Sequence, residues 1–525
     1  MPIGDALIVV CFVGVLAFLA WEVWGATRVP VEFAGVTAGD HLSLEAAEGL
    51  RVEIVIDRTD SVSGADFTVN GAVPEDDTLD RTDSGFVWSP APLEEGNYEL
   101  GLTAPRPVLS DATFSWDFVV DGTPPPIDVP VPAAVGICDR TTVEGTSEAD
   151  VVLTANGEPV AVDGDGRFQL SFDQPPATPV QLVATDAAGN RSGHDLVVPT
   201  TYSASQGVHV TAAAWGHDDL RNGILDLVDR GLVSTVELDL KDEGGIVGYD
   251  TEVALAHTIG AVQNLYDLDE AIKTLKDRNV RVVGRIVAFR DAPLADWAWS
   301  HERQDMVAQT AEGEKLGTYG GFTNFANPDV QQYNLDIALE GVDAGIDDIL
   351  WDYVRRPEGA LSGMVFPGMG GSVTTEVADF LAFTGSALRE RCAYQGASVF
   401  GIAADRPDAV GQDVGLIAQR VDYIAPMLYP SHWVRGEYGV ADPNRQPYDI
   451  VKATLADFQA KTEGTGVALV PWIQDFSLGH PYGPDEVRAQ IDAARDLGVD
   501  DWLLWNASVV YTDQALDPGL IASVG

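Results

Sequence analysis

Apolar and amphipathic segments alternate along the chain from Gly207 onward, and this pattern restricts the fold more than any other feature. Short apolar runs are typical of buried strands, and the longer amphipathic stretches between them are typical of helices. Such alternation is the signature of parallel βαβ units. The strand-like runs are residues 207–215, 235–242, 281–289, 347–355, 398–406, 423–430, 466–476 and 501–508. Eight strands in about 300 residues predict a (β/α)8 TIM barrel over residues 207–525.

An open, doubly wound sheet is the structural alternative to a barrel. It would require a glycine-rich phosphate-binding turn after an early strand. The first strand-like run instead ends in AAAWGHDDL. The barrel is therefore favoured.

Short alternating segments separated by Gly, Asp, Pro and Asn precede the barrel. They predict two all-β sandwiches, over residues 31–122 and 127–201, joined by the linker DGTPPP. The segment TDAAGN in the second block resembles the last hairpin of bacterial Ig-like modules of secreted proteins. We interpret both Ig-like blocks as spacers. Carbohydrate binding is the alternative, but neither block has an obvious row of exposed aromatic residues.

The N-terminus contains an uncharged apolar run, Ala6 to Trp21. It favours a single-pass transmembrane anchor within residues 1–29, with the other domains outside the cytoplasm. A cleaved signal, which would make the protein secreted, and a buried helix are the alternatives. The predicted fold class is therefore multidomain, with an N-terminal transmembrane helix, two Ig-like sandwiches and a C-terminal TIM barrel.

The charge of the chain is strongly negative, with 31 basic residues against 81 acidic ones and a net charge of −50. Such a surface repels phosphate backbones, so a nucleic-acid partner is not expected. The cysteines are Cys11, Cys138 and Cys392, and their positions imply no disulfide framework. Because no clustered Cys/His ligand spacing is present, we expect neither a metal nor a cofactor.

Side-chain alternation in the strands predicts which polar groups face the inside of the barrel. Val236, Leu238 and Leu240 should face the helices, so that a charged set points inward. This inward set is Glu237, Asp239 and Lys241 on the second strand, Arg285 on the third and Asp352 on the fourth. Buried charges must be paired, and a purely structural salt-bridge lattice is the alternative to an active site.

Glycoside hydrolysis needs two carboxyl groups that flank the bond to be cleaved. Asp352 is the strongest candidate for the nucleophile, because it ends a hydrophobic strand and Arg355 and Arg356 follow it. The general acid needs a raised pKa, and both Asp475 and Asp242 lie in apolar or acidic surroundings that would supply one. Asp405, at the end of the fifth strand, is a further candidate.

Aromatic residues that could stack on sugar rings lie at or just past the strand ends, and a few polar side chains accompany them. The predicted substrate-binding residues are Trp215, Tyr429, His432, Trp433, Trp472, Gln474, Trp505 and Asn506, together with Glu237, Asp239, Lys241, Arg285 and Arg355. A polysaccharide or cell-wall glycan is therefore the expected partner.

Seven of the eight strands carry motifs of a known family. GVHVTAAAWG, VELDLKDEGG, VVGRIVAFRD, ILWDYVRRP, IAPMLYPSHWVRGEYGVADPN, PWIQDF and LLWNAS resemble, in order and spacing, a family of glycoside hydrolase barrels named as a domain of unknown function. That family is related to α-amylase-type enzymes. The resemblance implies a TIM barrel that acts on carbohydrate.

The chain departs from the α-amylase pattern at three places. Leu350 stands where those enzymes carry an arginine two residues before the nucleophile, and Arg285 is the possible substitute cation. The fifth strand offers Asp405 instead of a glutamate, and Gln474 and Asp475 replace a His-Asp pair. These differences argue against cleavage of α-glucan and leave another glycosidase activity open.

The sequence thus predicts a glycosidase of extracellular or cell-wall polysaccharide. A catalytically silent barrel that binds glycan in the cell envelope is the first alternative. A metal-dependent amidohydrolase or deacetylase is the second, but it would need clustered histidines at the strand ends. The chain offers only a scattered set, His209, His217, His257, His432 and His480.

Overall fold

The computed structural model describes residues 28–106, 109–203, 205–516 and 518, which form two compact units. Within the described residues, the first unit extends to Pro130 and also includes Glu144–Leu170 and Gln181–Asp195. The second unit includes Val131–Val143, Ser171–Val180 and the chain from Leu196 onward. The predicted block 127–201 is therefore divided between the units, and its boundary with the barrel stays a prediction.

The predicted fold class must be corrected at the N-terminus. Among the described residues, no helix has the length and apolar character needed to cross a membrane. The run from Ala6 to Trp21, which suggested the transmembrane helix, lies outside the described residues.

The first unit contains a sandwich of two four-stranded sheets. One sheet has the order β1 (Val31–Ala34), β3 (Val52–Ile56), β6 (Gly85–Trp88) and β5 (Leu79–Thr82), and the other has the order β2 (Asp40–Leu42), β8 (Ala112–Val120), β7 (Gly96–Ala104) and β4 (Asp66–Val69). Two short helices, α2 (Leu44–Ala47) and α3 (Thr59–Val62), lie between strands. Ile54 and Phe86 of one sheet share a core with Phe67, Leu102 and Phe118 of the other.

The following segment is also all-β. Its strands are β9 (Thr141–Thr146), β10 (Val152–Ala155), β11 (Glu158–Val160), β12 (Arg167–Phe172), β13 (Val180–Thr185) and β14 (Arg191–Leu196). They form a sheet of order β11-β10-β13-β14 and the pair β12-β9. Asn156 and Gly157 have positive φ in the two-residue turn between β10 and β11, as an Asn-Gly hairpin requires. Kinship of either β segment to Ig-like modules stays a prediction.

The second unit contains the predicted barrel. Its parallel strands are β15 (Gln206–Val210), β16 (Thr235–Lys241), β17 (Arg281–Val287), β19 (Asp348–Asp352), β21 (Tyr394–Phe400), β22 (Tyr423–Met427), β24 (Trp472–Gln474) with the short β23 (Ala468–Leu469), and β25 (Trp502–Trp505). Each strand pairs with the next, and β25 pairs with β15, which closes the barrel.

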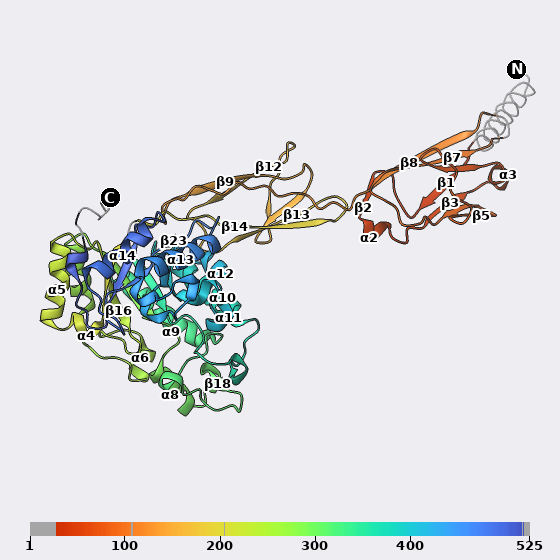
Figure 1. Ribbon diagram of the computed structural model, residues 1–525. Coiled ribbons are helices and arrows are strands. Elements are labelled where there is room, and N and C mark those ends of the chain that lie inside the picture. The colour runs from red at the N-terminus through yellow and green to blue at the C-terminus, as the bar shows by residue number, and fades with distance from the viewer. Residues whose placement is uncertain (1–27, 107–108, 204, 517, 519–525) are drawn as a thin grey trace, which may run out of the picture. The chain divides into compact units, whose positions relative to one another are not determined.

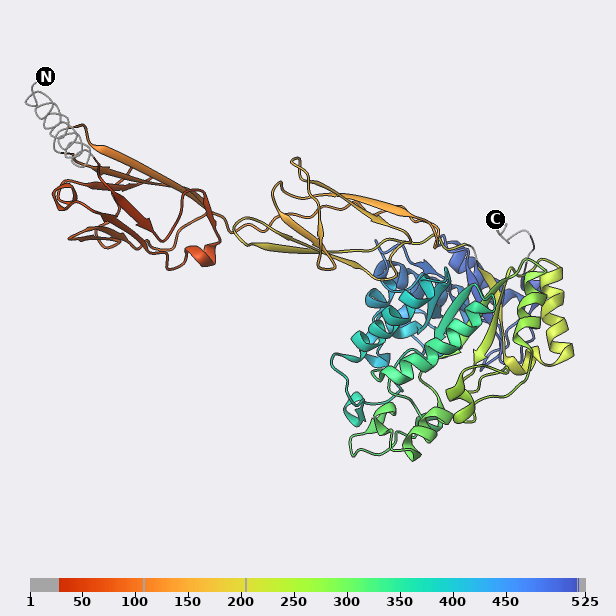
Figure 2. The same ribbon diagram turned by 180° about the vertical axis from the view of Figure 1, so that it is seen from behind.

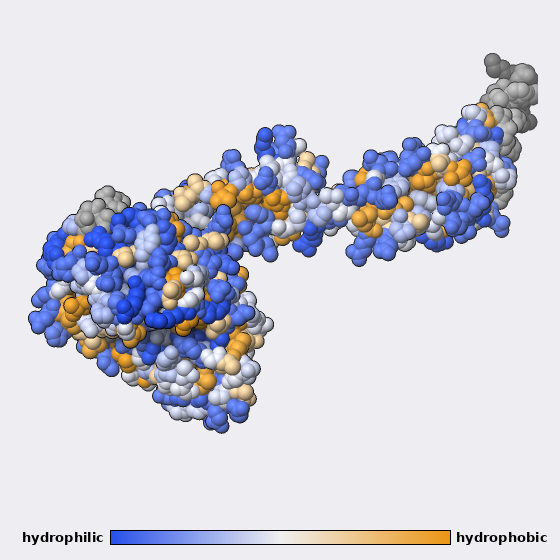
Figure 3. Space-filling view, in the orientation of Figure 1, coloured by the Kyte–Doolittle hydropathy of each residue, from blue (hydrophilic) through white to orange (hydrophobic). Residues whose placement is uncertain are grey.

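Helices surround the strands, as Figures 1 and 2 show from opposite sides. They are α4 (Ala212–Trp215), α5 (Asp218–Asp229), α6 (Ala254–Thr258), α7 (Leu268–Lys276), α8 (Ala292–Ser300), α9 (Pro328–Asp343), α10 (Val373–Arg389), α11 (Pro407–Val410), α12 (Val414–Ala418), α13 (Pro447–Lys461) and α14 (Pro484–Arg495). Asn327 caps α9 by accepting from the backbone N–H groups of Asp329 and Val330, and Pro328 fits the first helical turn. The side of the barrel that Figure 3 shows is largely hydrophilic, with smaller hydrophobic patches between the polar residues.

A cluster of buried polar residues closes the amino-terminal end of the barrel. Arg281, at the start of β17, forms a salt bridge with Asp348 at the start of β19. The hydroxyl of Tyr202 donates to Asp348 at 2.8 Å, and the ring of Tyr202 lies 4.2 Å from the guanidinium carbon of Arg281. The chemistry must therefore lie at the other end of the strands.

The expectation of no disulfide framework is wrong for one pair of cysteines. Cys138 and Cys392, which are 254 residues apart in the sequence, form a disulfide. Cys138 precedes β9 and Cys392 lies between α10 and β21, and both belong to the second compact unit. The spacing in the sequence could not indicate this bond, because the fold brings distant segments together.

Replacing both bonded cysteines by serine should lower the stability of the second unit. A crosslink across so long a segment restricts the unfolded chain and contributes about 2–4 kcal/mol. Calorimetry should show a lower melting temperature for Cys138→Ser/Cys392→Ser, close to that of the wild type under reducing conditions. The variant itself should not respond to reductant; equal melting temperatures for oxidised wild type and variant would contradict the prediction.

Candidate active site

Arg285, on β17, joins carboxylates from three neighbouring segments at the carboxyl end of the strands. Its Nε and Nη2 donate to Oδ2 of Asp352 at 3.0 and 2.6 Å, and its Nη1 donates to Oδ1 of Asp239 at 2.7 Å. Nη2 also bonds Glu243, which follows β16. Oε1 of Glu237 lies 3.8 Å from Nε. We call these five residues the Arg285 network.

In the Arg285 network, four carboxyl groups surround a single guanidinium group. Burial by itself would lower the pKa of Arg285, but Glu243, Asp239 and Asp352 outweigh it and raise that pKa well above its ordinary value. Burial acts to raise the pKa of Asp239, but His209 and Arg285 outweigh burial. The pKa of Asp239 is therefore lowered from its ordinary value. Nε2 of His209 lies 2.9 Å from Oδ1 of Asp239, so a second cationic or donor group supports this carboxylate.

Glu237 differs from the other acids because it lies deeper in the barrel. It pairs in register with His209 on β15 and with Val283 on β17, two residues below the Asp239–Arg285 pair. Its side chain is fully buried, and neither carboxyl oxygen has a hydrogen-bond partner in the described part of the chain. Burial therefore raises the pKa of Glu237 well above its usual value. Among the four acids of the network, burial therefore favours the neutral form most at Glu237.

Lys241 does not point into the barrel as the alternation predicts. The register between β16 and β17 shifts between Asp239 and Lys241, so that Lys241 pairs with Ile286 instead of continuing the inward row. A β-bulge of this kind inserts one residue and reverses the direction of those that follow. The Lys241 ammonium bonds Asp291 at 2.8 Å and Asn334 of α9 at 2.7 Å. It supports the barrel wall rather than the mouth.

The other predicted carboxylates lie outside the Arg285 network. Burial raises the pKa of Asp475 to about 6, although the hydrogen bonds from Thr512 act to lower it. Those bonds, from the backbone N–H and hydroxyl of Thr512, occupy both of its oxygens. Oδ1 of Asp242 accepts from the backbone of Gly244 and Ile246 and shapes a loop. Asp405 is exposed and pairs with Arg406.

The predicted aromatic set divides into a wall at the mouth and residues of the interior. The rings of Tyr429, His432 and Trp505 meet Phe476, with centroid distances of 5.8, 6.3 and 5.0 Å. Tyr429 is itself buried behind Phe476 and Trp505, and Trp215, Trp433 and Trp472 are buried as well. The indole N–H of Trp472 donates to Ser398 inside the barrel, so it belongs to the core.

Three predicted polar residues hold loops in place. The side chain of Gln474 accepts from the backbone of Ser431 and donates to that of Phe476. Asn506 donates to the backbone carbonyls of Asp475 and Val510. Arg355 bonds the backbone of Arg356 and the carboxylate of Glu358, so the cation at Asp352 is Arg285 and not Arg355.

Glu243 and His209 are members of the site that the sequence interpretation missed. Alternation from Val208 and Val210, which face the outer core, would have placed His209 inside the barrel. Glu243 lies beyond the end of β16, where no strand period applies. Only its position directly after the acidic strand end could have suggested it.

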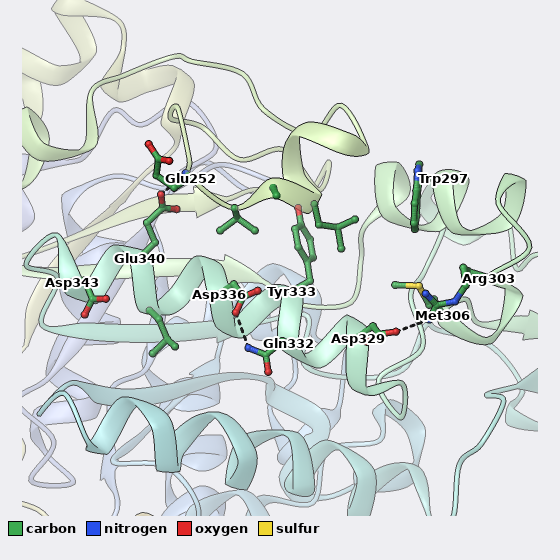
Figure 4. A pocket seen from close by; sticks show the side chains of 14 residues that line it. Glu252, Trp297, Arg303, Met306, Asp329, Gln332, Tyr333, Asp336, Glu340 and Asp343 are labelled. Atoms are coloured by element: carbon green, nitrogen blue, oxygen red, sulfur yellow. Dashed lines mark hydrogen bonds and ion pairs between the residues drawn. The ribbon is translucent and has the colours of Figure 1, made fainter.

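A separate hollow of about 780 Å³ lies on the flank of the barrel, away from the Arg285 network. Figure 4 shows Asp329, Gln332, Asp336 and Asp343 along α9 and Trp297 on α8. None of its lining residues belongs to the network. Within the described residues, no group of three or more His, Cys, Asp or Glu side chains is arranged to hold a metal ion.

The family model described as "Putative glycosyl hydrolase domain" matches residues 207–511, which is more than half of the chain. The chain belongs to this family. The match covers every strand of the barrel and the whole Arg285 network. No curated protein matches the chain.

Solved structures similar to this chain have low similarity scores. A hypothetical protein from Ruminiclostridium thermocellum is 28% identical over 36% of this chain and 96% of its own, with a TM-score of 0.33. The PgaB (BpsB) glycoside hydrolase domain from Bordetella bronchiseptica is 16% identical over 59% of this chain and 95% of its own, with a TM-score of 0.45. An endo-1,4-β-D-mannanase from Thermotoga petrophila is 14% identical over 58% and 88%, with a TM-score of 0.37. Such scores transfer no substrate to this chain.

Replacing Lys241 by methionine should destabilise the barrel without removing its chemistry. The change leaves the fully buried Asp291 without its cation, which costs about 3–5 kcal/mol. Urea unfolding followed by tryptophan fluorescence should show the loss. The double variant Lys241→Met/Asp291→Asn should recover part of it. Normal stability with lost activity would instead place Lys241 in the active site.

Proposed function

We propose that the chain hydrolyses an O-glycosidic bond of an extracellular or cell-wall polysaccharide, with Asp352 as nucleophile and Glu243 as the second carboxyl group. The observation that carries this proposal is the sharing of one nitrogen, Nη2 of Arg285, by both carboxylates. Two groups bonded to one atom lie within the sum of two hydrogen-bond lengths, so their oxygens are at most about 5 Å apart. A separation near this value is typical of retaining glycosidases.

Asp352 is suited to attack the anomeric carbon. It ends β19 at the carboxyl face of the barrel, where active sites of this fold lie. Arg285 holds one of its oxygens, and the backbone N–H of its neighbour Tyr353 donates to the other at 2.7 Å. Both contacts fix the orientation of the carboxylate group for attack.

Glu243 is suited to move the proton because it is the most accessible carboxyl group of the network. Its side chain is 33% exposed, against 5% for Asp352 and none for Asp239. Burial acts to raise its pKa, and Arg285 outweighs burial and lowers it. A bound sugar ring would remove water from Glu243 and add to the raising effect, which favours the acid form.

The reaction follows from these positions. Asp352 forms a bond to the anomeric carbon while Glu243 gives its proton to the departing glycosidic oxygen. Water then attacks the glycosyl ester, gives a proton to Glu243 and releases Asp352 as a carboxylate. The half-buried rings of Phe476 and Trp505, which pack against the buried Tyr429, offer apolar faces to the sugar rings.

Replacing Asp352 by asparagine should abolish hydrolysis. The amide cannot form the glycosyl ester, so kcat should fall by at least about a thousandfold in a screen of polysaccharides. Asp405→Asn is the matched control, since Asp405 is exposed and outside the network, and it should retain activity. Equal hydrolysis by wild type and Asp352→Asn would refute the role of Asp352. Binding without hydrolysis by the wild type would support a glycan-binding scaffold instead.

Replacing Glu243 by glutamine should slow the enzyme according to the leaving group. Loss of a general acid typically costs about a hundred- to ten-thousandfold. Aryl glycosides whose leaving group needs no proton should lose much less in the first step than the natural polymer. The wild type should release the product with its anomeric configuration retained, which NMR can follow. Inversion, or no effect of the variant on either substrate, would exclude this role for Glu243.

A further inference from the structure

We infer that Arg290, with Tyr319 and Tyr353, forms a subsite at the barrel mouth for a carboxylate carried by the glycan, as in a uronic acid. This inference rests on the proposed function, because it concerns the substrate of the same site. Arg290 lies just beyond the end of β17, and Tyr353 directly follows Asp352. The subsite is therefore next to the proposed nucleophile.

The two tyrosine rings hold the Arg290 side chain in one place. Its guanidinium carbon lies 4.3 Å from the ring centre of Tyr319 and 5.1 Å from that of Tyr353. The two rings meet at 86° with their centres 6.3 Å apart, so Arg290 occupies the corner between them. Its Nη1 donates to the hydroxyl of Tyr353 at 2.8 Å. Fixing a long side chain in this way reduces the entropy lost when it binds a ligand.

Arg290, unlike Arg285 and Arg355, has no carboxylate partner among the described residues. Arg285 carries the carboxylates of the network, and Arg355 pairs with Glu358 at 2.8 Å. Arg290 bonds only the neutral hydroxyl of Tyr353, and its Nε is shielded from water without an acceptor. A group shielded from water is shielded from a ligand as well, so an anionic ligand would accept from Nη2, for which the described residues offer no acceptor.

A neighbouring cation adds to the positive character of this side of the mouth. The guanidinium of Arg356 donates to the backbone carbonyls of Asp408, Pro357 and Gly359 and, within the described residues, has no carboxylate partner either. Asp352 and Glu358, the carboxylates closest in sequence to Tyr353 and Arg356, are held by Arg285 and Arg355, and Asp291, which follows Arg290, pairs with Lys241. No nearby acid is therefore free to neutralise Arg290.

The backbone of both tyrosines supports a functional reason for this arrangement. Tyr319 has φ of 54° and Tyr353 has φ of 49°, which is the left-handed region that non-glycine residues seldom adopt. Such strain persists where the surrounding structure imposes it, often at ligand sites. Here it aims both rings at the same arginine.

The fork of an arginine matches a carboxylate, which can accept two parallel hydrogen bonds. The negative charge of the whole chain opposes binding of an anionic polymer at long range, but salt screens that repulsion beyond about 8 Å. A contact with Arg290 acts well within this distance. The subsite would therefore select a uronate unit locally in an otherwise acidic protein.

The test uses matched polymers and the full chain. Alginate, polygalacturonate and hyaluronan are each compared with their carboxyl-reduced forms, in hydrolysis by the wild type and in binding to Asp352→Asn. At least one uronate polymer should be preferred over its reduced form by about tenfold or more. Arg290→Gln should remove that preference, and Arg290→Lys should restore part of it. Arg303→Gln, which removes a charge on the flank, should keep the preference unchanged.

Failure of this inference is distinguishable from failure of the proposed function. If no polymer is cleaved, the proposed hydrolysis fails, and binding to Asp352→Asn still decides the subsite. If neutral polymers are cleaved or bound as well as their uronate forms, or if Arg290→Gln keeps the preference, the subsite is refuted. Preference for a phosphorylated or sulfated glycan over uronate polymers would likewise overturn the carboxylate assignment. A lower melting temperature of Arg290→Gln with no change in preference would show a purely structural role.

Discussion

The contact of one buried arginine with several carboxylates is the interaction on which the mouth of this barrel depends. Asp239, Glu243 and Asp352 could not lie so close together unless a cation stood between them, because buried like charges repel strongly and lose the stabilisation of water. Arg285 supplies that cation from the strand between theirs. The same contact sets the spacing of the two carboxyl groups that we propose for catalysis. Both the packing of this face and its proposed chemistry therefore depend on Arg285.

The β-bulge in β16 separates the residues of that strand that belong to the Arg285 network from Lys241, which supports the barrel wall. Before the bulge, Glu237 and Asp239 face the barrel interior; after it, Lys241 turns outward to Asp291 and Asn334. Without the bulge, a second buried cation would stand near Arg285 and compete for the same carboxylates. Its outward ion pair instead ties the strand to α9 and to the start of α8. One inserted residue thus leaves Arg285 as the cation that bonds both Glu243 and Asp352.

The sequence predicts the barrel and its acidic face well, because each depends on a local period. Alternation along β16, β17 and β19 is sufficient to bring Asp239, Arg285 and Asp352 together. It fails for Lys241, since a bulge leaves no mark in the hydrophobic pattern, and for Glu243, which lies in a loop. It also cannot indicate the Cys138–Cys392 bond, which depends on tertiary proximity. Position at a strand end also does not separate tryptophans of the mouth from those of the core: Trp472 is buried, because a wide barrel interior needs large side chains to fill it.

The distribution of charge around the mouth reflects the small number of cations in this chain. With 31 basic residues against 81 acidic ones, most buried or half-buried arginines have a carboxylate within reach. Arg285 uses four of its five N–H donors on carboxylates of the network, which leaves little of it for a ligand. A substrate that approaches Asp352 therefore meets two surfaces of different kinds: apolar ring faces around Phe476 and Trp505, and the donors of Arg290 on the side of Tyr353. Sugar rings suit the first surface, and only an acceptor group suits the second.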